Sequence, residues 1–93
     1  MKAILNGAVL AESDTTVVVE GNHYFPPTSI NRQYFNDTDL NTACPWKGTA
    51  SYYTVTVDGE EFANLGWYYP TPKDAAAEIR DHVAFHPKVT ISA

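Results

Sequence analysis

The chain has 93 residues, with six Lys and Arg against eleven Asp and Glu, so its net charge is −5 at pH 7. This acidity argues against nucleic acid as a partner, because a phosphate backbone would be repelled rather than neutralised. No apolar run approaches the roughly 20 residues of a membrane span, and the single cysteine excludes an internal disulfide. We therefore expect one cytoplasmic domain over residues 1–93 that contacts neither nucleic acid nor membrane.

β-Branched and alternating runs predict short antiparallel strands along most of the chain. In chain order the predicted strands are residues 2–5, 8–12, 15–20, 23–25, 40–43, 49–57, 67–69, 81–86 and 88–92. Tight turns are expected at Asn6-Gly7, Gly21-Asn22 and Asp58-Gly59, because glycine tolerates the left-handed backbone that such turns need. The polar residues 36–39 predict a loop.

Two segments predict helical structure. Ser29 can cap a short helical turn through Tyr34, after two prolines that end the preceding strand. A longer helix is expected from Thr71 to about Arg80, with Thr71 as its cap and Pro72 in its first turn. The predicted fold class is therefore mainly β, or α+β, with small antiparallel sheets and one short C-terminal helix.

The longest predicted strand, residues 49–57, has two distinct faces. Side chains alternate along a strand, so Tyr53, Val55 and Val57 share one face. We expect this face to point into the core. Tyr52 belongs to the opposite, mixed face.

Cysteine, tryptophan and lysine meet in the stretch Cys44-Pro45-Trp46-Lys47-Gly48, where proline and glycine bend the backbone. This stretch, with the Gly21–Pro26 segment before it and the Trp67–Pro70 segment after it, resembles the bacterial family known as domain of unknown function 427. The resemblance covers nearly the whole chain. It implies a β-tent, in which two small antiparallel sheets lean against each other with a cleft between them.

Distant β-tent relatives often hold zinc through two cysteine pairs, which this chain lacks. The resemblance therefore implies the shape without a metal, and we expect neither a metal nor another cofactor. The three histidines do not replace the cysteines. His82 and His86 would stand roughly 13 Å apart on one strand at about 3.3 Å per residue, and His23 lies in a distant segment.

Aromatic side chains and one cation form the predicted ligand site. Flat rings suit a planar or cationic ligand, and an exposed lysine beside turn amides suits a carboxylate or phosphate. The candidate ligand-binding residues are Tyr24, Trp46, Lys47, Tyr52, Trp67 and Tyr69. The alternatives are core packing for each ring, and for Lys47 a surface position that covers Trp46 through a cation–π contact. Arg32 would add a second cation if residues 29–34 fold over the cleft.

Two residues are candidates for catalysis. Cys44 lies near Lys47, whose positive charge favours the reactive thiolate, although a free cysteine more often packs as a small apolar side chain. Glu20 ends a predicted strand just before a turn and is the best candidate for an acid or base. Its alternative is a solvated glutamate at a strand end.

No complete catalytic constellation is visible, so the preferred function is binding of a small molecule. A small enzyme that acts on the same ligand by acid, base or thiol chemistry is the first alternative. A protein-interaction domain is the second. The sequence leaves open the identity of the ligand, the oligomeric state, and whether the three motif segments meet in space.

Overall fold

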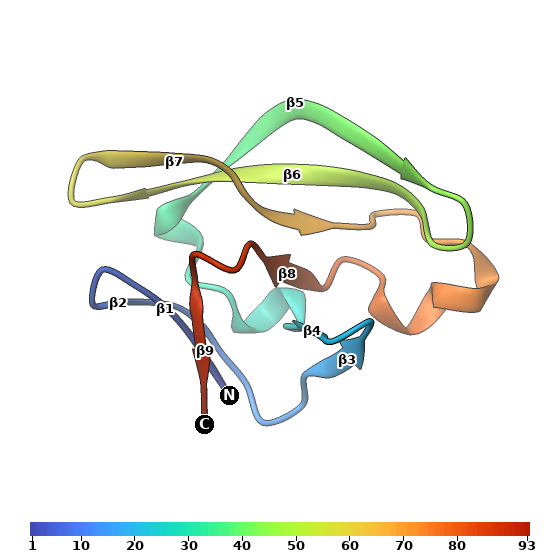
Figure 1. The fold of residues 1–93 in the computed structure, drawn as a ribbon, viewed down its shortest axis with the longest axis horizontal. Coiled ribbons are helices and arrows are strands. Elements are labelled where there is room, and N and C mark those ends of the chain that lie inside the picture. The colour runs from blue at the N-terminus through green and yellow to red at the C-terminus, as the bar shows by residue number, and fades with distance from the viewer.

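The computed structural model describes the whole chain, residues 1–93, as a mainly β protein with three short 3₁₀ helices (Figure 1). The strands are β1 (Lys2–Leu5), β2 (Ala8–Glu12), β3 (Val17–Val19), β4 (Asn22–Tyr24), β5 (Phe35–Cys44), β6 (Gly48–Val57), β7 (Glu60–Tyr68), β8 (Val83–Phe85) and β9 (Thr90–Ser92). The helices are η1 (Pro27–Ser29), η2 (Arg32–Tyr34) and η3 (Asp74–Ile79). The predicted mainly β class is confirmed.

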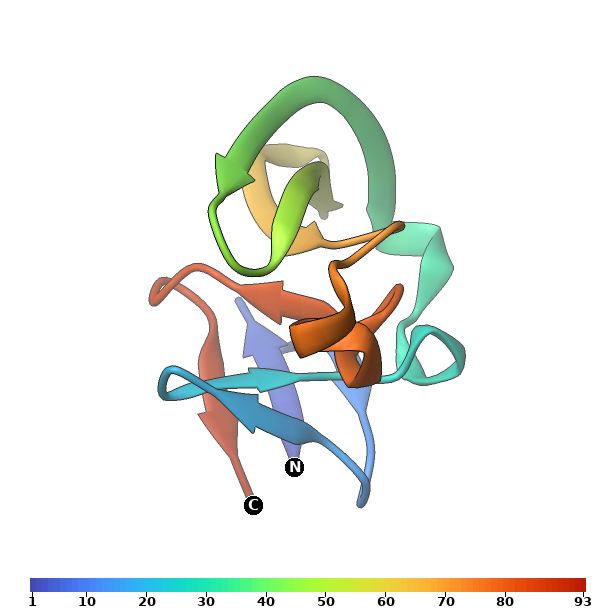
Figure 2. The ribbon, with the colours of Figure 1, turned by 90° about the vertical axis from the view of Figure 1, so that its right-hand side faces the viewer.

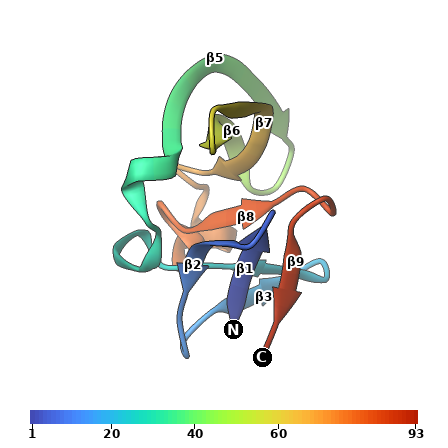
Figure 3. The same cartoon turned by 90° about the vertical axis from the view of Figure 1, so that its left-hand side faces the viewer.

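The strands form three sheets, whereas the resemblance implied two. Their orders are β2-β1-β9, β3-β4 and β5-β6-β7-β8, and all pairings are antiparallel. β9 pairs with β1 and not with β8, its neighbour along the chain, whereas β8 joins β7. β5 arches over β6 and β7 on one side of β8, and the two smaller sheets lie on the other side (Figures 1 and 3).

Three hairpins share one type of turn. The two turn residues have φ values of 50° and 80° at Asn6-Gly7, 53° and 80° at Glu20-Gly21, and 50° and 80° at Asp58-Gly59. Two positive φ values suit the right-handed twist of the flanking strands, and Asn-Gly and Asp-Gly are the dipeptides that adopt them best. The turn predicted at Gly21-Asn22 lies one residue earlier, at Glu20-Gly21. Consequently Glu20, a residue type that disfavours the left-handed region, occupies the first turn position.

The polar residues 36–39 are part of β5, so the predicted loop is wrong. Their pairing with β6 is irregular, with a shift of register between Asp37 and Asn41. Within this bulge the Thr38 hydroxyl donates to the backbone carbonyl of Tyr52 at 3.3 Å. This cross-strand hydrogen bond holds the segment in an extended conformation, although its polar composition favours a turn.

The predicted α-helix over residues 71–80 is also wrong, since only the 3₁₀ helix η3 forms there, without a side-chain cap. The segment is anchored at both ends. The backbone N–H of Lys73 donates to the carbonyl of Lys47 at 2.9 Å, and the N–H of Asp81 donates to the carbonyl of Tyr69 at 3.1 Å. Because so short a helix has little stability of its own, these two backbone hydrogen bonds determine the conformation of the segment. None of the three 3₁₀ helices has the length and hydrophobicity of a membrane span.

The other predicted boundaries differ in smaller ways. Strands β3, β8 and β9 are shorter than predicted, β4 begins one residue earlier than predicted, and β7 begins seven residues before the predicted start at Trp67. The helical turn expected between Ser29 and Tyr34 forms as two separate 3₁₀ helices, η1 and η2. Neither has a side-chain cap, so Ser29 does not have the expected role.

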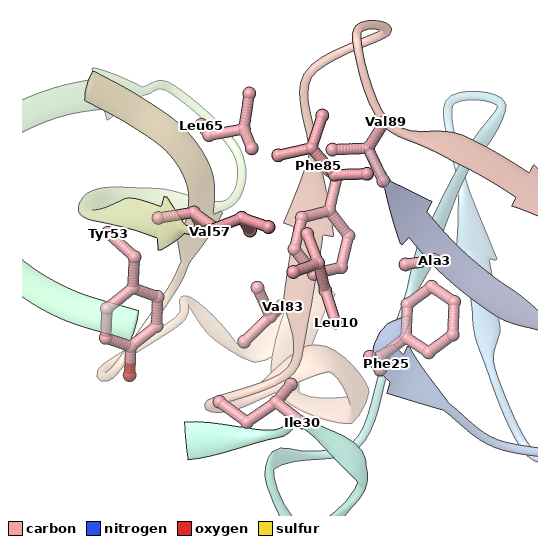
Figure 4. Packing of buried hydrophobic residues seen from close by; sticks show 13 residues of the cluster. Ala3, Leu10, Phe25, Ile30, Tyr53, Val57, Leu65, Val83, Phe85 and Val89 are labelled. Atoms are coloured by element: carbon pink, nitrogen blue, oxygen red, sulfur yellow. The ribbon is translucent and has the colours of Figure 1, made fainter. Parts of the chain in front are cut away.

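Strand β8 lies at the centre of the main core. Val83 and Phe85 are 1% and 6% exposed, and they pack between Val57 of β6 on one side and Leu10 of β2 and Phe25, which directly follows β4, on the other (Figure 4). The predicted alternation in β6 is confirmed, because Tyr53, Val55 and Val57 are all buried on this side. Side chains on the opposite face of β6 belong to a second cluster.

Candidate functional site

The second cluster of side chains lies where the β5–β6 turn, η3 and the β3–β4 hairpin meet (Figure 2). Its buried members are Tyr24, Ala50, Tyr69, Ala76, Ile79 and Ala84. Cys44, Tyr52 and Trp67 pack against it and are half-buried. Because strand side chains alternate, Tyr52 reaches this cluster while Tyr53 enters the main core.

Lys47 is the only charged residue that is buried, at 7% exposure. It ends the turn that joins Cys44 to Gly48, two residues that pair across the β5–β6 hairpin. Gly48 has a φ of +116°, and a Cβ placed there would lie 3.3 Å from the carbonyl oxygen of Thr71. The glycine therefore lets the β5–β6 turn press against the segment before η3. This close approach covers Lys47.

The ammonium of Lys47 has one carboxylate partner and two aromatic neighbours. Its Nζ donates to Oε1 of Glu20, whose side chain is 54% exposed. The same Nζ lies 5.3 Å from the ring centroid of Trp46 and 5.6 Å from that of Tyr69. The cation–π contact considered for Trp46 is confirmed, but the expected exposed position of Lys47 is wrong.

The ion pair fixes the charge of both partners. The hydrogen bond from Lys47 lowers the pKa of Glu20 below its usual value of 4.5, with a smaller contribution from the Trp46 indole. Burial alone would lower the pKa of Lys47, yet the hydrogen bond to Glu20 and the nearby phenol oxygens of Tyr24 and Tyr69 raise it above 10.5. Burial raises the pKa of Tyr69 above 10.0, against the opposing effect of Lys47. At neutral pH the group is an ammonium, a carboxylate and an uncharged phenol.

The remaining aromatic side chains of the cluster are joined by hydrogen bonds and a ring contact. Nε1 of Trp67 donates to the hydroxyl of Tyr24 at 3.2 Å, and Tyr24 is fully buried. The ring of Tyr52 lies 6.4 Å from that of Trp67, centroid to centroid, and its hydroxyl bonds the hydroxyl of Thr42 at 3.0 Å. Trp46 is the exception, since it is 40% exposed and offers a ring to solvent.

Lys47 and the other seven candidate ligand-binding and catalytic residues lie in or beside this cluster: Glu20, Tyr24, Cys44, Trp46, Tyr52, Trp67 and Tyr69. Arg32 is elsewhere, because its guanidinium lies 3.5 Å from the hydroxyl of Tyr53 on the other face of β6. The thiol of Cys44 makes no hydrogen bond to a histidine. The three motif segments do meet in space.

Sequence reasoning missed the pairing of Glu20 with Lys47. One signal was available: the other two hairpin turns use Asn-Gly and Asp-Gly, whereas this turn uses Glu-Gly. A longer acidic side chain at a position that favours Asn or Asp indicates that its carboxylate has a distant partner.

The cluster is filled by its own side chains. The surface has three pockets, and none is lined by Lys47 or by the rings around it. The expected open aromatic cleft is therefore closed in this conformation. The exposed carboxylate of Glu20, the rings of Trp46 and Tyr69 and the segment before η3 together leave the Lys47 side chain 9% exposed.

Fold and site together define a small, mainly β protein that keeps one ion-paired ammonium inside an aromatic cluster. Residues 1–92 match the family described as domain of unknown function (DUF427), so the chain belongs to this family. No curated protein matches the chain.

Proposed function

We propose that this protein binds a small molecule that carries an anionic group, and that Lys47 receives this group. The observation that carries the proposal is that the only buried charge of the protein is balanced by a single exposed carboxylate. Lysine is almost never buried unless it is paired, because desolvation of the ammonium is costly. A domain that retains such a group at the centre of its motif segments is a candidate for binding an anion.

Glu20 acts in this proposal as an internal substitute for the ligand. Its carboxylate occupies the position that a ligand anion would take, which agrees with the absence of an open pocket around Lys47. One feature favours its displacement. The side chain is half exposed, so its carboxylate is readily hydrated after release.

The ligand class follows from the groups that are present. One ammonium balances one negative charge, which favours a carboxylate over a phosphate dianion. Trp46 adds an exposed ring beside the ammonium, against which a flat ligand can stack. A planar aromatic carboxylate combines both features, and benzoate is the simplest probe.

Binding is a better proposal than catalysis. A general acid or base works best with a pKa near the operating pH, whereas the pKa of Glu20 is lowered and that of Lys47 is raised, both away from neutrality. A protonated lysine is also no nucleophile. The ion pair therefore suits recognition of charge more than transfer of a proton.

Titration with benzoate and with benzamide, its uncharged counterpart, tests the proposal. A ligand at 100 times its Kd adds about 2.7 kcal/mol to the free energy of unfolding, which corresponds to a rise of about 10 to 20 °C in Tm for a domain of this size. We expect benzoate to raise Tm more than benzamide does, and Lys47→Met to abolish that difference.

The variant Glu20→Gln separates this proposal from an enzyme in which Glu20 contacts the ligand. Removal of the competing carboxylate should tighten benzoate binding by about tenfold if the closed state holds about 90% of the population. Weaker binding in Glu20→Gln, or an equal response to benzamide, would overturn the proposal.

A further inference from the structure

We infer that a second, independent ligand site lies beside the turn and the start of β4 in the β3–β4 hairpin, and that it takes an uncharged single-ring molecule with a hydrogen-bonding group. The site is a pocket of about 250 Å³ between this hairpin and the β8–β9 connection. Its lining residues are Gly21, Asn22, His23, Phe85, His86, Pro87, Val89 and Ile91. It shares no residue with the Lys47 cluster.

The walls of this pocket are held by the fold. Phe85 and Val89 are 6% and 4% exposed and belong to the main core (Figure 4). The backbone N–H of His86 donates to the carbonyl of Leu65 at 2.8 Å, and that of Val89 donates to the carbonyl of His86 at 2.9 Å. The connection that carries His86 is thus fixed on both sides, and the pocket exists without a rearrangement.

In both histidines of the pocket, one ring nitrogen forms a hydrogen bond within the protein and the other has no partner. Nδ1 of His86 accepts the backbone N–H of Lys88 at 3.1 Å, so the proton of the neutral ring lies on Nε2. Nδ1 of His23 bonds the hydroxyl of Thr16 at 3.0 Å. Neither Nε2 has a partner in the protein, so each ring retains a nitrogen for a ligand.

The absence of charge in the lining sets the ligand class. The neighbouring pocket on the other side of His86 is lined by Glu60, Glu61 and Lys88, and a neutral ring there would compete with hydration of these charges. The pocket with His23 has only apolar walls, an amide and two imidazoles. Its volume lies below the roughly 300 to 1,000 Å³ of sites for drug-sized ligands, which limits the occupant to about one ring.

Phenol is the probe, and toluene is its counterpart without a hydrogen-bonding group. In a titration followed by ¹H–¹⁵N NMR, phenol should cause saturable shifts confined to residues 21–23 and 85–91. His86→Ala should weaken phenol binding about fivefold, the factor for a net hydrogen bond of about 1 kcal/mol, and toluene should bind less tightly by a similar factor.

Two control variants make the test specific. His82→Ala removes a histidine outside the pocket, whose Nδ1 lies 2.8 Å from the carbonyl oxygen of Arg80, and should leave phenol binding unchanged. Ile91→Trp fills the pocket and should abolish binding. Lys47→Met should bind phenol as the wild type does, even if benzoate fails to bind at Lys47. Unsaturable or scattered shifts, or equal affinity in His86→Ala and wild type, would overturn the inference.

Discussion

Replacement of either partner of the ion pair should have unequal effects on stability, because one partner is buried and the other is exposed. Lys47→Met keeps the apolar stem of the side chain and leaves Glu20 charged in water. The variant loses two cation–π contacts of about 0.5 to 1 kcal/mol each and a charge-assisted hydrogen bond of about 1.5 to 3 kcal/mol. It also removes the desolvation of the ammonium, which costs several kcal/mol.

These contributions nearly cancel, so the free energy of unfolding of Lys47→Met should lie within about 1 kcal/mol of the wild-type value. Tm should then change by less than about 8 °C. Glu20→Ala has the opposite consequence, because it leaves the ammonium buried without an anion. We expect it to lower stability more than Lys47→Met does, although Glu20 is itself exposed.

Chemical denaturation of the two single variants and of the double variant measures the coupling directly. The double variant should recover most of the stability that Glu20→Ala loses, because no unpaired ammonium remains. A stable Glu20→Ala together with a Lys47→Met variant that loses several kcal/mol would refute this reasoning. Lys47 would then be a packing residue whose charge has no special cost.

Three further predictions concern the same region. Trp67→Phe should lower the free energy of unfolding by about 1 to 3 kcal/mol, because it leaves a buried tyrosine hydroxyl unpaired, whereas Trp46→Phe at an exposed position should cost less in the same denaturation assay. Gly48→Ala should destabilise more than Gly59→Ala, because both have positive φ but only the first places a Cβ against backbone atoms; equal Tm values would contradict this. The pKa of Lys47 is raised in the folded protein. The stabilising contribution of its charge is therefore complete below pH 10.5 and is lost as the pH rises through the folded-state pKa. Tm of the wild type should consequently fall more steeply above pH 10.5 than Tm of Lys47→Met.

Local patterns predicted the parts of the fold that local physics controls. Asn6-Gly7 and Asp58-Gly59 form the expected turns, because their backbone preference agrees with the twist of the hairpins. The alternation in β6 placed Tyr53 in the core and Tyr52 on the other face. The eight candidate residues, chosen with the help of the resemblance, lie close together in the structure.

The errors fall where distant contacts override local preference. Residues 36–39 favour a loop, but cross-strand bonds hold them in β5. The segment before Arg80 favours an α-helix, but its ends are fixed to Lys47 and Tyr69, and only a 3₁₀ helix fits between them. The burial of Lys47 depends on the approach of three separate segments, which no window of the sequence contains.

The central claim is that an anion can replace Glu20 at the ammonium of Lys47, and NMR of these two side chains tests it most directly. The ¹⁵N resonance of the Lys47 ammonium and the ¹³C resonance of the Glu20 carboxylate are followed during a titration with benzoate. The account predicts that both shift together and saturate at one Kd, with the Glu20 signal moving to the position of a free, hydrated carboxylate. A Lys47 resonance that stays constant, or a Glu20 carboxylate that remains bound to it at high benzoate concentration, would contradict the account.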